Sequence, residues 1–111
     1  MTTPGSQAVF HAIAEPTRRK ILDALAAGPR AAGALALRFP TSRPSVARHL
    51  RVLRESGLVL VRSEGRRRVY TLNPARLRAV ARWISRYERF RKDRLNRARF
   101  GEDRKPERRK P

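Results

Sequence analysis

The sequence predicts a mainly α-helical domain that carries one small β-hairpin, and the stretch from Thr41 to Tyr70 shows why. Apolar residues recur there at helical spacing, after a Thr-Ser pair that can cap the helix and a proline that suits its first turn. A Ser-Gly pair ends this helix, and two short apolar and β-branched runs follow around a basic turn. A capped helix followed by a basic hairpin is the outline of a winged helix-turn-helix, an architecture that binds DNA.

The helix of this stretch is expected to run from Pro44, near its first position, to the Ser56-Gly57 pair. Its buried face is formed by Val46, Leu50 and Leu53. The two strands are expected at residues 58–61 and 69–72, with residues 63–68 as the turn between them.

Three further helices are expected before this stretch. The first begins at Ser6 and stops at Glu15-Pro16, because the residue before a proline avoids the α region. The second opens at Pro16 and ends at Gly28-Pro29. The third spans about residues 31–39 and lacks a Ser, Thr or Asp cap. Their inward residues are Ile21, Leu22, Leu25, Leu35 and Phe39.

After the hairpin, Asn73-Pro74 is expected to cap and start a long terminal helix. One apolar stripe of this helix contains Leu77, Val80, Ile84 and Tyr87, and Trp83, Phe90 and Leu95 widen it. We therefore expect a flexible start at residues 1–5 and a winged helix-turn-helix domain with a C-terminal dimerisation helix at 6–100. Residues 101–111 are expected to be a disordered, charged tail.

Composition narrows the class of function. The 111 residues suffice for one domain, and the formal charge of +19 makes a polyanion the first partner to consider. The absence of cysteine excludes disulfides and thiolate metal sites. No acid pair, catalytic triad or phosphate-binding loop is evident, so we do not expect an enzyme. No apolar run reaches the ~20 residues of a membrane span, and no signal peptide is evident, which predicts a cytoplasmic protein.

Three phrases of the sequence resemble, in the same order, the ArsR/SmtB-type bacterial repressors, a family of winged helix-turn-helix proteins. Residues 10–22 (FHAIAEPTRRKIL) resemble the phrase that joins the family's first two helices. Residues 45–59 (SVARHLRVLRESGLV) resemble its recognition helix, and residues 64–72 (EGRRRVYTL) resemble its wing. Residues 83–90 (WISRYERF) resemble an autorepressor-like branch with an aromatic-rich last helix. The resemblance covers about residues 8–75 and implies a dimeric transcriptional repressor.

The resemblance does not extend to the family's metal sites. Its metal sensors carry a Cys-x-Cys pair in the third helix, where this chain has Ala31-Ala32-Gly33-Ala34-Leu35. Others bind zinc through Asp, His and Glu of the last helix, but residues 74–100 contain no His and only two carboxylates, Glu88 and Asp93. We therefore expect no metal and no cofactor, and the inducing signal stays open.

The candidates for DNA contact lie near the start of the expected recognition helix and on the wing. An Arg at that end of the helix can hold a guanine edge through two hydrogen bonds. A basic wing can reach phosphates or the minor groove. The alternatives are a solvated helix face and a charged turn that protects a sheet edge. The candidates are Ser42, Arg43, Ser45, Arg48, His49 and Arg51 in the helix and Arg66, Arg67 and Arg68 on the wing.

The last helix has a broader apolar strip than one small domain buries, so it folds back across the core or pairs with a second chain. We assign a two-fold interface to Val9, Phe10, Ile13, Leu77, Val80, Ile84 and Tyr87. A symmetric dimer would place two recognition helices about one DNA turn apart, ~34 Å, and would read an inverted repeat in double-stranded DNA.

The leading hypothesis is a homodimeric, sequence-specific repressor, associated with the bacterial nucleoid, that acts on its own or a neighbouring operon. Two alternatives stay open. The charge is also compatible with a nonspecific architectural or nucleoid protein, since phosphate neutralisation alone gives roughly micromolar binding. The Arg-rich last helix is also compatible with a membrane-surface or partner-binding element.

Overall fold

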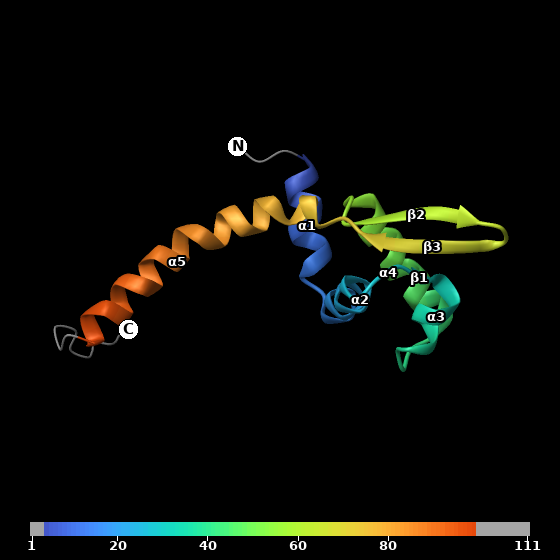
Figure 1. Cartoon of the computed structure of the whole chain (residues 1–111), viewed down its shortest axis with the longest axis horizontal. Coiled ribbons are helices and arrows are strands. Elements are labelled where there is room, and N and C mark those ends of the chain that lie inside the picture. The colour runs from blue at the N-terminus through green and yellow to red at the C-terminus, as the bar shows by residue number, and fades with distance from the viewer. Residues whose placement is uncertain (1–3, 100–111) are drawn as a thin grey trace. The chain divides into compact units, whose positions relative to one another are not determined.

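The computed structural model of the chain describes residues 4–99. The elements are α1 (Pro4–Ile13), α2 (Pro16–Ala26), β1 (Arg30–Ala31), α3 (Ala32–Leu37), α4 (Arg43–Glu55), β2 (Val59–Glu64), β3 (Arg67–Leu72), the 3₁₀ helix η1 (Pro74–Leu77) and α5 (Arg78–Arg99) (Figure 1). They form two compact units, one ending at Val80 and the other beginning at Ala81. The mainly helical winged helix-turn-helix fold is confirmed. Most of the expected flexible start, residues 1–3, and the whole expected tail, 101–111, lie outside the described residues.

The core of the first unit lies where α1, α2, α3 and α4 meet the sheet. The predicted inward face of α4 is confirmed, since Val46, Leu50 and Leu53 are all buried. Ile21 of α2 and Leu35 of α3 are fully buried in the same cluster. Burial of each such side chain stabilises the fold by about 1.5–3 kcal/mol. The helical spacing of these apolar residues places them on one face of each helix, and that face packs into the core.

The sheet has three antiparallel strands in the order β1-β3-β2, one more than the sequence analysis predicts. β1 pairs Arg30 with Tyr70 and Ala31 with Val69, so β3 becomes the central strand. A strand of two residues is too short to show the alternation by which strands are predicted. It nevertheless covers one edge of β3, directly before α3 begins.

The hairpin is tighter than expected. Only Gly65 and Arg66 lie between β2 and β3, and Glu64 pairs with Arg67. Gly65 has φ +63°, and no non-Gly residue described has a positive φ. Gly at the first central position is typical of a two-residue II′ turn, which lets the strand ladder continue almost to the tip. The sequence analysis placed Arg67 and Arg68 in the turn, and this placement is wrong because both belong to β3.

Two helix starts also differ from the expected ones. α1 begins at Pro4 and not at Ser6, because a proline fits the first turn of a helix, where its missing N–H has no partner to lose. Asn73 and Pro74 precede η1, and α5 follows from Arg78. The Asn73 side chain makes no cap; its Nδ2 donates to the Gly57 carbonyl at 3.0 Å and thereby ties the end of the hairpin to the end of α4.

We expect Leu53→Ala to lower the free energy of unfolding by about 2–5 kcal/mol, because it opens a cavity at a fully buried position. Urea denaturation followed by circular dichroism measures the change. Leu37→Ala is the matched control, since Leu37 is 81% exposed and its loss should shift stability by no more than about 0.5 kcal/mol. Equal effects of the two substitutions would contradict the described core.

Candidate nucleic-acid interface

The start of α4 is fixed by its own residues. Ser42 is the N-cap, and its hydroxyl oxygen accepts a hydrogen bond from the Ser45 amide at 3.2 Å. Pro44 follows within the first turn, where it needs no hydrogen-bond partner. The cap prediction is confirmed, and it gives Ser42 a structural role beside its candidate role in DNA contact.

The surface of α4 away from the core is strongly basic. Arg43, Arg48 and Arg51 are all exposed, as expected for DNA contact. Arg54, one turn beyond Arg51, is exposed as well and was missed, although its three-residue spacing from Arg51 was a readable signal. The ion pairs found within residues 4–99 are Arg62–Glu64 and Arg91–Glu88, so none of these four guanidinium groups is neutralised by a described carboxylate.

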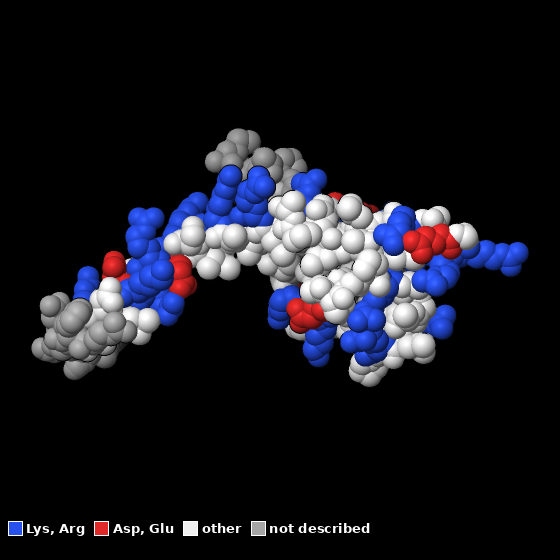
Figure 2. Space-filling model, in the orientation of Figure 1, with Lys and Arg blue, Asp and Glu red and all other residues white. Residues whose placement is uncertain are grey.

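The wing adds a second basic surface. Figure 2 shows Lys and Arg side chains at the tip of the β2–β3 hairpin, where Arg66, Arg67 and Arg68 are all exposed. The acidic residue nearest the turn, Glu64, is held by Arg62, whose Nε lies 2.6 Å from its carboxylate. Because Glu64 is paired with Arg62, it does not compensate the positive charge of Arg66, Arg67 and Arg68.

A buried arginine joins α4 to the helices behind it. Arg18 of α2 is only 9% exposed, and its Nε donates to the Ala12 carbonyl at 2.7 Å, while Nη2 donates to the His11 carbonyl at 3.3 Å. These carbonyls belong to the last turn of α1, where carbonyls lack partners within the helix; that of His11 also accepts from the Ala14 amide at 3.2 Å. The third guanidinium nitrogen, Nη1, lies 3.2 Å from Nδ1 of His49 in α4. Sequence analysis assigned no role to Arg18, because these contacts cross up to 31 residues.

This contact determines which ring nitrogen of His49 remains available for a further hydrogen bond. A guanidinium group can only donate hydrogen bonds, so Nδ1 of His49 must accept and the neutral ring carries its proton on Nε2. His49 is half-buried, so it is not an open surface side chain. Its second nitrogen, an N–H donor, is the polar atom left for an acceptor on a phosphate or a base.

The turn between α1 and α2 is closed by Glu15, the N-cap of α2. Its side chain accepts a hydrogen bond from the Arg18 amide at 2.9 Å. That bond is the main reason why the pKa of Glu15 is lowered from its ordinary value of 4.5, and the Thr17 amide and the nearby charge of Arg18 act in the same direction. The sequence analysis predicted the proline start of α2 but not this cap.

The residues assigned to a two-fold interface divide into three groups. The placement of Val9 there is wrong, because Val9 is 1% exposed in the single chain and belongs to its core. Ile13, Leu77 and Val80 pack partly against that core, and Phe10 is half-buried.

The remaining interface candidates lie on α5. Ile84 and Tyr87 are exposed, beside Trp83, whose ring meets that of Tyr87 edge-on with centroids 5.3 Å apart. Phe90 is 61% exposed as well. An exposed aromatic cluster of this kind on one helix is typical of an interaction surface.

Among residues 4–99, no group of three or more His, Asp or Glu side chains is placed to hold a metal ion. Over the same range, no helix combines the length and apolar character needed to cross a bilayer.

Comparison with known proteins agrees with this geometry. A family model described as a helix-turn-helix domain matches residues 13–62. The chain is 46% identical over 78 residues to the HTH-type transcriptional regulator Rv2034 of Mycobacterium tuberculosis, covering 70% of this chain and 73% of that protein. It is 40% identical over 76 residues to the transcriptional repressor SdpR of Bacillus subtilis, covering 68% of this chain and 84% of that protein.

Solved structures show the same fold. The ArsR family transcriptional regulator RHA00566 superimposes with a TM-score of 0.71 at 30% identity, covering 84% of this chain and 97% of the other. The homodimeric winged helix-turn-helix domain of Mb0332 from Mycobacterium bovis, described as a possible ArsR-family regulator, gives 0.62 at 32% identity, covering 76% and 81%.

Fold and relatives together define a winged helix-turn-helix DNA-binding protein that regulates transcription. The chain belongs to the ArsR family of transcriptional regulators.

We expect the neutral His49 ring to carry its proton on Nε2, with Nδ1 unprotonated, because Arg18 donates to Nδ1. Long-range ¹H–¹⁵N correlation spectra above neutral pH distinguish the two tautomers directly. In parallel, Arg18→Met should lower the free energy of unfolding by about 1–3 kcal/mol, since the Ala12 carbonyl loses its buried guanidinium donor.

Arg19→Met is the control for that substitution, because the exposed Arg19 donates to the neighbouring Ile13 carbonyl but does not reach His49. It should cost no more than about 0.5 kcal/mol. A protonated Nδ1, or equal costs for the two substitutions, would contradict the assigned role of Arg18.

A second expectation concerns acid stability. Since the folded pKa of Glu15 is lowered, the cap stabilises the fold above the ordinary value of 4.5, and this contribution is lost as the pH falls through the folded value. Glu15→Gln keeps an acceptor but cannot ionise. The unfolding free energies of wild type and variant, measured by urea titration, should therefore differ most near neutral pH and converge in acid. A difference that grows in acid would refute this sign.

Proposed function

We propose that the chain acts as a homodimeric repressor that binds an inverted-repeat operator, in its own or a neighbouring operon. The observation that carries this proposal is the row of exposed, unneutralised arginines on a capped α4, next to a basic wing. The named repressor activity of SdpR and the homodimeric state of the Mb0332 domain support it.

The dimer in this proposal forms through the exposed apolar side of α5. Ile84 and Tyr87, with Trp83 and Phe90 beside them, are about half exposed in the single chain, and a second copy would cover them. The less exposed Phe10, Ile13, Leu77 and Val80 are assigned to the same two-fold interface in this proposal. Residues 6–100 of each chain then work as one domain, and the two recognition helices of the dimer lie ~34 Å apart.

Each basic group has a distinct role in this complex. Arg43, Arg48 and Arg51 of α4 face base edges and flanking phosphates in the major groove, where each bidentate contact discriminates by about 1–3 kcal/mol. Ser42 and Ser45 suit phosphate contacts, and His49 donates through Nε2. Arg66, Arg67 and Arg68 of the wing contact the phosphate backbone or the adjacent minor groove.

The alternative of a nonspecific nucleoid protein rests on charge alone. It does not explain why the start of the recognition helix is fixed by the Ser42 cap, or why Arg18 holds His49 within that helix. In our proposal the chain is a regulator without enzymatic activity that works on the chromosome in the bacterial cytoplasm.

The proposal is tested by selecting genomic fragments with the purified full chain at physiological salt and titrating the enriched sequence. A palindromic motif bound by two chains, far more tightly than scrambled DNA, is expected. Equal affinity for the selected and scrambled duplexes would overturn the proposal and leave the charge as the sole basis of binding.

We expect Arg48→Ala to weaken binding to the selected operator by about five- to 150-fold and to relax preference at one base pair of each half-site, because it removes a base contact. Fluorescence anisotropy on the operator and on single-base variants measures both effects. Lys92→Ala removes the same charge from α5 and is the control, with the ratio of specific to nonspecific affinity expected to stay unchanged. A similar loss on all sequences in both variants would assign Arg48 to phosphate only.

A further inference from the structure

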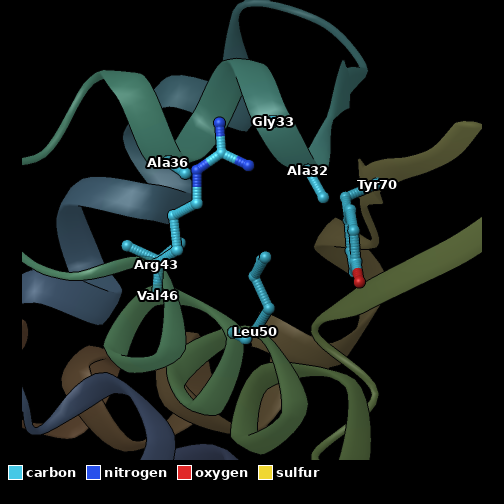
Figure 3. A pocket seen from close by; sticks show the side chains of 8 residues that line it. Ala32, Gly33, Ala36, Arg43, Val46, Leu50 and Tyr70 are labelled. Carbon is cyan, nitrogen blue, oxygen red and sulfur yellow. The ribbon is translucent and has the colours of Figure 1, made fainter.

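A pocket of about 180 Å³ lies within the first unit, between α3, α4 and β3 (Figure 3). The floor is formed by Val46 and Leu50 of α4, and the ring of Tyr70 from β3 stands as one wall. The opposite side is formed by α3, whose residues here are all small: Ala32, Gly33 and Ala36. The pocket thus lies inside the helix-turn-helix itself, next to the recognition helix.

The small residues leave real space. A Cβ atom added to Gly33 would meet no atom within 4 Å. Gly33 also has no positive φ, so its backbone does not require glycine. Backbone conformation therefore gives no reason for glycine at this position, and its missing side chain leaves the α3 side of the pocket open.

Two polar groups meet this apolar space. Arg43 reaches from the start of α4 across the pocket towards α3, and no carboxylate among residues 4–99 neutralises it (Figure 3). Tyr70 is only 7% exposed, and its ring stands beside the pocket with a polar hydroxyl at its end, so it offers a ligand an aromatic wall.

We propose that this pocket binds a small organic carboxylate with a flat apolar body, of the size of benzoate. An apolar cavity of about 150 Å³ is known to hold a benzene ring, and the volume here is slightly larger. The ring would stack against Tyr70 above Val46 and Leu50, and the carboxylate would pair with the Arg43 guanidinium.

This site would give the regulator an effector, a consequence that rests on the proposed function. Arg43 is one of the candidate contacts to DNA, and a guanidinium group paired with a ligand carboxylate is no longer available to a phosphate or base. Ligand and operator would then compete for the same side chain, so each would lower the affinity of the other by the same factor.

The first experiment needs no DNA. Benzoate is titrated into the ¹⁵N-labelled full chain, and amide shifts of α3, α4 and β3 are followed. Gly33→Leu should fill the pocket and weaken binding at least about tenfold, while helix formation is retained because leucine is a good helix former. Ala34→Leu, at an exposed neighbouring position of α3 outside the pocket, should change the affinity less than about twofold.

A second variant keeps the test independent of packing. Arg43→Gln should weaken benzoate binding but leave binding of the neutral analogue benzamide unchanged, since only the charge partner is removed. Absence of benzoate shifts in the pocket, or binding that survives Gly33→Leu, overturns the proposed site.

The operator complex is examined last. Benzoate should weaken operator binding by the wild-type chain and have no such effect on Gly33→Leu. Because binding in the pocket and binding to the operator are measured separately, failure of the site and failure of the repressor proposal give different results. Benzoate that binds the pocket without weakening operator binding overturns the effector role alone.

Discussion

The buried guanidinium group of Arg18 is the contact on which the rest of the interface depends. It joins three helices, because it extends from α2, satisfies the last carbonyls of α1 and holds His49 of α4. A buried charge is costly unless its hydrogen bonds are made, and here Nε and both terminal nitrogens have an acceptor within 3.3 Å. The rotation of α4 about its own axis, and so the set of side chains on its exposed face, is fixed by this contact together with the burial of Val46, Leu50 and Leu53.

Local chemistry explains which parts of the fold could be predicted from the sequence. The Ser42 cap, the proline starts of α2 and α4 and the buried stripe of α4 all depend on residues within one or two turns, so spacing alone predicts them. The missed features are of two kinds. β1 is too short for any periodicity, and the contact between Arg18 and His49 spans 31 residues. The predicted turn was also longer than the observed one, because the sequence does not show how far the hydrogen-bonded ladder between two strands continues beyond their apolar residues.

Charge and position make separate contributions at the candidate interface. The formal charge of +19 favours any polyanion and carries no sequence information. Specificity requires donors held in fixed places, and the structure supplies them differently in α4 and in the wing. In α4 the cap, the buried stripe and Arg18 fix the helix, while in the wing the two-residue turn fixes the tip and Arg62 removes the competing charge of Glu64. The wing therefore suits general attraction to the backbone, and α4 suits base recognition.

The packing between α3 and α4 is incomplete at the pocket that lies between them. Leu35 is completely buried on the core side of α3, as a short helix needs, yet three other positions of the same helix carry Ala or Gly next to open space. A larger side chain at Gly33 would meet no obstruction, since no atom lies within 4 Å of the position that its Cβ would take. Departures from local consistency of this kind are expected at functional positions. The combination of this space with the uncompensated Arg43 and the aromatic wall of Tyr70 is what makes a ligand a better explanation of the pocket than imperfect packing.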